Sequence, residues 1–92
     1  MKLLNKDELS EKLNELKDWQ LVDNKLVKEL KLKNFSDAIA FIVKVGIEAE
    51  KLDHHPDINL YGWNNVKIFL STHDAGGITE KDINLAHKIN QL

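Results

Sequence analysis

The helix-period stretch at residues 35–52 constrains the fold most, because its apolar residues recur every three or four positions. Asn34 or Ser36 can cap its start. Pro56 disfavours helical geometry for the residue before it, so the helix is predicted to end by His54. Apolar residues also lie off the main stripe, which predicts burial against a sheet and against a further surface such as a subunit interface. The stripe comprises Phe35, Ala38, Ile39, Ile42, Val45, Gly46, Ala49 and Leu52, and Phe41, Val43 and Ile47 lie off its centre.

The segments around this helix switch between strand and helix periodicity. A first helix is predicted over residues 6–16, capped by Asn5. Alternation over residues 19–22 and 26–32 predicts a hairpin with its turn at 23–25, and residues 64–73 alternate again. Thr79 caps a last helix, with Asp82 three residues later. A short extra strand is possible on this pattern near residues 58–61.

This order predicts an α+β fold of one domain over residues 1–92, with elements in the order α-β-β-α-β-α. An antiparallel sheet with the helices packed on one face is the natural arrangement. The chain of 92 residues has no cysteine, so disulfides and thiolate metal sites are excluded. Stability must therefore come from one small core. Oligomerisation can extend this core where a second subunit covers the other apolar face of the long helix.

Charge and hydropathy narrow the classes of partner. Thirteen basic and fifteen acidic residues are interspersed, with a net charge of -2, which argues against a nucleic-acid interface. The first residues are too charged for a secretory signal, and no apolar run approaches the roughly 20 residues of a membrane span. We therefore expect a cytoplasmic protein without a membrane partner.

Three of the four histidines lie at predicted element ends, where binding and catalytic groups are often placed. His54 and His55 follow the long helix, and His73 ends the strand of residues 64–73. Neighbouring side chains of an extended segment point in opposite directions, so the adjacent imidazoles can share a pocket only where the chain bends. The transition from the helix end to Pro56 is a natural place for that bend.

Spacing alone leaves three interpretations of this cluster open. Three imidazoles can bind a catalytic zinc ion, but adjacent histidines lack the His-x-x-x-His spacing that puts two ligands on one helix face. Two imidazoles held close can supply one acid and one base, because like charges push their pKa values apart. Alternatively, His-His-Pro is a plain helix-terminating loop with a cationic histidine at the helix C-terminus.

A set of anchors stands at fixed spacing: Glu50-x3-His54-His55-Pro56, six residues to Trp63, nine more to His73 and eight more to Asp82. The segments EAEKLDHHP, LSTHDAGGIT and EKDINLA surround them, and Trp19 follows the first helix. In these features, densest over residues 35–89, the chain resembles the pterin-4a-carbinolamine dehydratase family.

The resemblance implies dehydration of 4a-hydroxytetrahydropterin to quinonoid dihydropterin and water, in tetrahydrobiopterin recycling, with no metal or organic cofactor. It implies homo-oligomers, either dimers or tetramers. A non-catalytic dimerisation module of the transcriptional coactivator type on the same fold is the alternative. The implied catalytic residues are His54, His55 and His73, with His55 or His73 preferred as acid and His54 as base. The implied substrate-binding residues are Glu50, Asp53, Ser71, Thr72, Asp74, Trp19 and Trp63.

Overall fold

The computed structural model describes residues 2–92, which form three α-helices, four strands and one short 3-10 helix. This confirms the predicted α+β class. The elements are α1 (Lys6–Glu15), β1 (Gln20–Val22), β2 (Lys25–Lys31), α2 (Phe35–Lys51), β3 (Asp57–Tyr61), β4 (Asn65–Leu70), η1 (His73–Ala75) and α3 (Glu80–Asn90).

The four strands form one antiparallel sheet in the order β1-β2-β4-β3. A two-residue turn joins β1 to β2 and a three-residue turn joins β3 to β4, and two residues of each take the left-handed backbone conformation. In the first turn these are Asp23 and Asn24, which tolerate positive φ well. In the second they are Gly62 and Trp63. The two-residue turn matches the right-handed twist of the strands that it joins.

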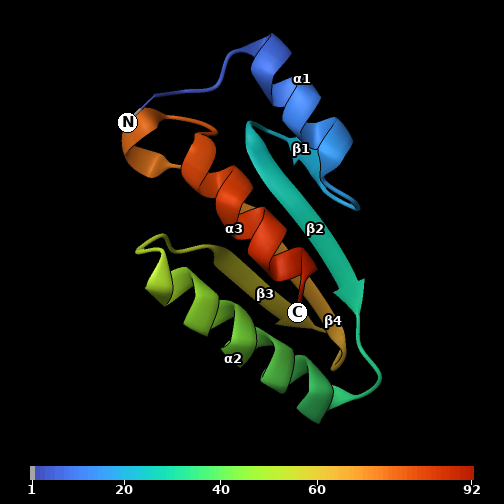
Figure 1. Ribbon diagram of the computed structural model, residues 1–92. Helices are drawn as coiled ribbons and strands as arrows, with labels where there is room; N and C mark the ends of the chain where they lie inside the picture. Colours follow the sequence, from blue (N-terminus) through green and yellow to red (C-terminus); the bar gives the residue numbers. More distant parts are fainter. Residues whose placement is uncertain (1) are drawn as a thin grey trace.

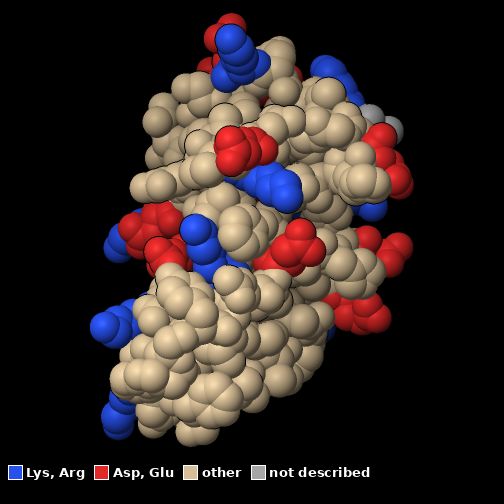
Figure 2. Space-filling model, turned by 180° about the vertical axis from the view of Figure 1, so that it is seen from behind, with Lys and Arg blue, Asp and Glu red and all other residues tan. Residues whose placement is uncertain are grey.

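Helices α2 and α3 lie on the same face of the sheet (Figure 1) and contact one another. The core between these helices and the sheet is apolar, and α1 adds Leu9 to it. The opposite face is open: Lys, Asp and Glu side chains cross its middle, and the end drawn lowest in Figure 2 shows a broad surface without them. Among the fully buried apolar side chains are Leu26, Val45, Val66, Ile68, Leu70, Ile83, Leu85 and Ile89.

The structure differs from the predicted elements in three places. The short strand considered near residues 58–61 is a full strand, β3, paired along its length with β4. The first turn has two residues, because Lys25 already pairs with Val22. The last predicted strand ends at Leu70 rather than at His73, which begins η1. The backbone turns away there because Thr72 pairs with Gly77 instead of continuing the ladder.

No helix within residues 2–92 combines the length and the apolar character that crossing a membrane requires.

Candidate active site

The C-terminus of α2 directs the two adjacent histidines in opposite directions. Asp53 takes the left-handed conformation, with φ of 50°. The His54 backbone N–H donates to the Ala49 carbonyl at 3.1 Å, and the Asp53 N–H donates to the Glu50 carbonyl at 3.1 Å. These two bonds are those of a Schellman motif. The bend is therefore made at Asp53, one residue before the two histidines and within the predicted transition from the helix end to Pro56.

The left-handed position of Asp53 leads to a stability prediction. Glycine adopts positive φ without steric cost, whereas alanine does not. Asp53→Gly is expected to raise the free energy of unfolding by about 0.5–1 kcal/mol, and Asp53→Ala to lower it by a similar amount. Urea unfolding of the three proteins measures both changes. Equal stability of the glycine and alanine variants would contradict the assignment of this bend to backbone conformation.

His54 points inward and belongs to a buried polar network. Its side chain is 10% exposed, and its Nε2 lies 2.5 Å from Oδ1 of Asp82, which is fully buried. The other oxygen of Asp82 accepts from the Thr72 hydroxyl at 2.7 Å and from the Thr79 backbone N–H at 2.9 Å. The Thr79 hydroxyl lies 2.7 Å from that of Thr72. Since the Thr72 proton goes to Asp82, Thr79 donates to Thr72, and every member of the network is hydrogen-bonded.

His55 points outward and pairs with a carboxylate of α2. Its Nε2 lies 3.1 Å from Oε1 of Glu50, and both side chains are mostly exposed, at 67% and 76%. An ion pair this exposed contributes little to stability. The contact instead orients the His55 imidazole at the rim of a cavity.

A cavity of about 310 Å³ brings residues from three parts of the chain together. His54 and His55 come from the end of α2, His73 from the start of η1, and Lys81 from the first turn of α3. Seven residues that sequence analysis placed at the site line this cavity, and Glu50 adjoins it through His55. The lining residues are Asp53, His54, His55, Ser71, Thr72, His73, Asp74 and Lys81.

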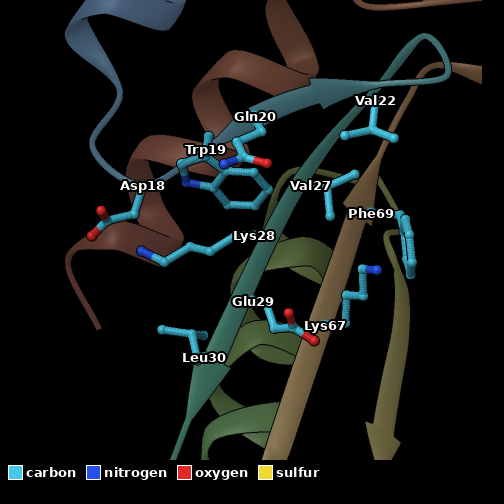
Figure 3. A pocket seen from close by; sticks show the side chains of 10 residues that line it. All are labelled: Asp18, Trp19, Gln20, Val22, Val27, Lys28, Glu29, Leu30, Lys67 and Phe69. Carbon is cyan, nitrogen blue, oxygen red and sulfur yellow. The ribbon is translucent and has the colours of Figure 1, made fainter.

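The two tryptophans assigned to the site lie elsewhere. Trp19 is buried, its indole N–H donates to Asn90 Oδ1 at 2.8 Å, and it lines a different cavity (Figure 3). Trp63 is 61% exposed in the turn between β3 and β4. Neither side chain lines the histidine cavity.

Two residues of this region were absent from the predicted site. Asp82 was predicted only as a capping residue of the last helix. The structure confirms this role, since α3 has a capping box of Thr79 and Asp82. Its contact with His54 spans 28 positions and follows from the packing of α3 against α2. The signal that could have found it is its fixed spacing from His73. Lys81 lines the cavity as its immediate neighbour and carried no separate signal.

Across residues 2–92, no group of three or more His, Asp or Glu side chains is arranged to hold a metal ion.

The comparisons with known proteins cover nearly the whole chain. The family model described as pterin 4 alpha carbinolamine dehydratase matches residues 2–92. A relative from Sulfolobus acidocaldarius is 44% identical over 89 residues, covering 97% of each chain. One from Chloroflexus aurantiacus is 45% identical over 92 residues, covering 100% of this chain and 98% of its own. Both are provisionally named pterin-4-alpha-carbinolamine dehydratases.

Solved structures point the same way. A Brucella melitensis protein, described as a transcriptional coactivator/pterin dehydratase, superposes with a TM-score of 0.90 at 41% identity, covering 98% of this chain and 97% of its own. A pterin dehydratase-like RuBisCO assembly factor of the alpha-carboxysome shares the fold, with a TM-score of 0.62 at 23% identity over 79% of this chain and 83% of its own. On the whole-chain match and the identity to its relatives, this chain belongs to the pterin-4a-carbinolamine dehydratase family.

Proposed function

We propose that the protein dehydrates 4a-hydroxytetrahydropterin to quinonoid dihydropterin, with histidines as general acid and base and without a cofactor. The observation that carries the proposal is the cavity that His54, His55 and His73 line from two separated segments. Membership of the dehydratase family supports the same substrate class. The reaction would serve the recycling of a tetrahydropterin cofactor.

The reaction requires two proton transfers. The C4a–O bond breaks as a proton reaches the leaving oxygen, which departs as water, and the C4a=N5 double bond forms as a base takes the N5 proton. A positioned acid and a positioned base each contribute about 10²–10⁴-fold to such a reaction. The bound ring would therefore lie between two imidazoles of different protonation state.

His54 is the better base candidate of the three. Asp82 accepts from Nε2, which leaves Nδ1 as the nitrogen able to take a proton. The buried carboxylate holds the ring in one orientation and stabilises the imidazolium that forms, as in a catalytic triad. Thr72 and the Thr79 backbone N–H fix Asp82 in turn.

His55 is the first acid candidate, because Glu50 holds its imidazole at the cavity rim through a contact of 3.1 Å. His73 lies on the η1 side of the cavity and is the second candidate for the acid. Ser71, with Asp53, Asp74 and backbone groups, would hold the polar edge of the pterin. Trp19 and Trp63 receive no contact with the ring in this proposal, since neither lines the cavity.

The experiment is a dehydration assay with chemically prepared 4a-hydroxytetrahydropterin, followed by ultraviolet absorbance against the spontaneous reaction. The proposal predicts catalysis by purified protein after treatment with a chelator. A rate equal to the spontaneous one would reject it. Repeating the assay with several C6 side chains identifies which pterin is preferred.

An apolar stripe on the outer side of α2 favours a homo-oligomer as well. Phe35, Ile39, Val43 and Ile47 recur every four residues and are between 42% and 56% exposed. Four large apolar side chains in one line are more than a monomer surface usually carries together. We propose that a second copy of the chain covers this stripe. The same surface is what a non-catalytic dimerisation module would use.

Val43→Lys is expected to dissociate this oligomer, because association would bury an unpaired ammonium group. Val43 is 56% exposed, so the folded monomer should be changed by no more than about 0.5 kcal/mol. Light scattering after size-exclusion chromatography measures the mass, with Lys44→Ala as control on the neighbouring position. A monomeric wild-type protein, or an unchanged mass for Val43→Lys, would contradict the interface. Retained assembly in a variant lacking all three cavity histidines would separate assembly from catalysis.

A further inference from the structure

The turn between β1 and β2 reaches the segment that carries His73. Within residues 2–92, one hydrogen bond joins this turn to that segment: the side-chain amide of Asn24 donates to the Gly76 carbonyl oxygen at 2.8 Å. The segment is a loop over residues 72–77, closed by antiparallel pairing of its two ends. η1 lies within this loop, and His73 is its first residue. Asn24 therefore contacts the loop directly after η1.

Side-chain packing from the turn does not hold His73 in place. A cavity of about 160 Å³ remains between the turn and the loop. His73 is exposed and lines both this cavity and the histidine cavity, so the position of its imidazole depends on the backbone of the loop. That backbone turns back after η1, where the N–H of Gly76 donates to the His73 carbonyl at 3.1 Å. Gly76 is left-handed there, with φ of 76°.

The carbonyl that Asn24 binds belongs to a flexible peptide. This peptide links Gly76 to Gly77, and neither residue has a Cβ atom to restrict its backbone. It also carries the Gly77 N–H, which donates to the Thr72 carbonyl at 3.4 Å. The turn approaches closely, since a Cβ atom on Gly77 would lie 2.9 Å from Asn24 Nδ2. The Asn24 bond therefore restrains the part of the loop with the greatest conformational freedom.

Asn24 is not the residue that the turn itself prefers. It is the second of two left-handed residues, with φ of 62°, in a two-residue hairpin turn. Glycine is favoured at this position because it takes positive φ without steric cost. A glycine would, however, leave the Gly76 carbonyl without this donor. The asparagine therefore indicates a role outside the turn.

We propose that Asn24 is a positioning residue, which acts through the Gly76 peptide to keep the His73 imidazole in the histidine cavity. The inference rests on the proposed dehydratase function, in which His73 is a candidate acid. Misplacing a reacting group by about 1 Å can cost roughly 10²-fold in rate. The bond lies at the surface and restrains the loop only in part, so we expect a loss of about tenfold in kcat/KM without it.

The first test needs no substrate. Proton–carbon correlation NMR of the intact protein follows the imidazole signals. Asn24→Gly is expected to shift or broaden the His73 signal and to leave that of His87 unchanged. Its urea unfolding midpoint should be no lower than that of the wild type, because glycine suits the left-handed position. Asp23→Gly is the matched control, since it makes the same exchange at the other left-handed residue and leaves the Asn24 bond in place.

An unchanged His73 signal in Asn24→Gly would overturn the proposal, as would an equal change of that signal in Asp23→Gly. This comparison holds whether or not the protein is a dehydratase.

The second test is the dehydration assay. Asn24→Gly is expected to lose about tenfold in kcat/KM, and Asp23→Gly to keep the wild-type value. Asn24→Asp keeps the shape of the side chain and its tolerance of positive φ but has no N–H to donate, so its loss should be of the same order. Wild-type kcat/KM in either Asn24 variant would overturn the positioning role. An inactive wild-type protein would reject the dehydratase function, and the NMR comparison would still decide whether Asn24 positions His73.

Discussion

His55→Ala is expected to lower kcat for dehydration by about 10²–10⁴-fold, the usual contribution of a positioned general acid. The imidazole lies at the cavity rim, held by Glu50 at 3.1 Å, and it is 67% exposed. Its removal therefore leaves the core intact, and the free energy of unfolding should change by no more than about 0.5 kcal/mol. Stopped-flow measurement of the dehydration under substrate saturation gives kcat directly.

His87→Ala is the matched control for this exchange. His87 is an exposed histidine in the last turn of α3 and does not line the cavity. Its removal should leave kcat unchanged. If His55→Ala retained wild-type kcat, the acid would have to be His73, and the corresponding His73→Ala variant would then show the loss. Full activity in both variants would reject acid catalysis by these imidazoles.

The fold was largely predictable because local signals agree with it. The Asn5 and Thr79 caps, the Asp23–Asn24 turn and the alternation of β2 each act over a few residues. β3 was recognised only as a short addition because its pattern, half-buried on alternate residues, is weak when read without its partner. Pairing with β4 along five consecutive residues stabilises β3. This pairing belongs to the tertiary structure and cannot be read from the β3 segment alone.

The sequence predicted which histidines line the cavity, but it did not predict which aromatic side chains lie away from it. The positions of His54, His55 and His73 at element ends indicated a shared site, and they line one cavity. Whether an aromatic side chain reaches that cavity depends on the face on which its element packs. Trp19 packs toward Asn90, and Trp63 falls in a turn that holds it outward. The spacing of residues along the chain does not predict the direction of either tryptophan side chain.

The bend between the two histidines illustrates the same limit. Pro56 is an evident signal for a helix end, whereas an aspartate at positive φ is not, since Asp adopts that conformation in a minority of cases. The Schellman bonds at Ala49 and Glu50 show where the chain reverses. Once Asp53 is left-handed, the next side chain turns into the core and the following one turns outward.

Asp82→Asn is expected to lower kcat roughly 10²-fold through misplacement of His54, with little change in KM because Asp82 does not line the cavity. Both carboxylate oxygens act as acceptors, for His54 on one side and for Thr72 and Thr79 on the other. An amide offers one acceptor oxygen and one donor nitrogen, so His54 keeps a partner only if its proton moves from Nε2 to Nδ1, the nitrogen proposed as the base. The associated loss of stability is about 1–3 kcal/mol.

Thr79→Ala separates positioning from stability. It removes the side-chain cap of α3 and the hydroxyl contact with Thr72, which lowers stability by about 1 kcal/mol. It leaves the contact between Asp82 and His54 in place. Urea unfolding gives the folded fraction, and kcat is then compared per folded molecule. If Asp82→Asn lost no more kcat per folded molecule than Thr79→Ala, the carboxylate would be a stabilising group alone. A loss confined to Asp82→Asn would mean that it orients the base, because the two variants share the destabilisation and differ in the imidazole contact.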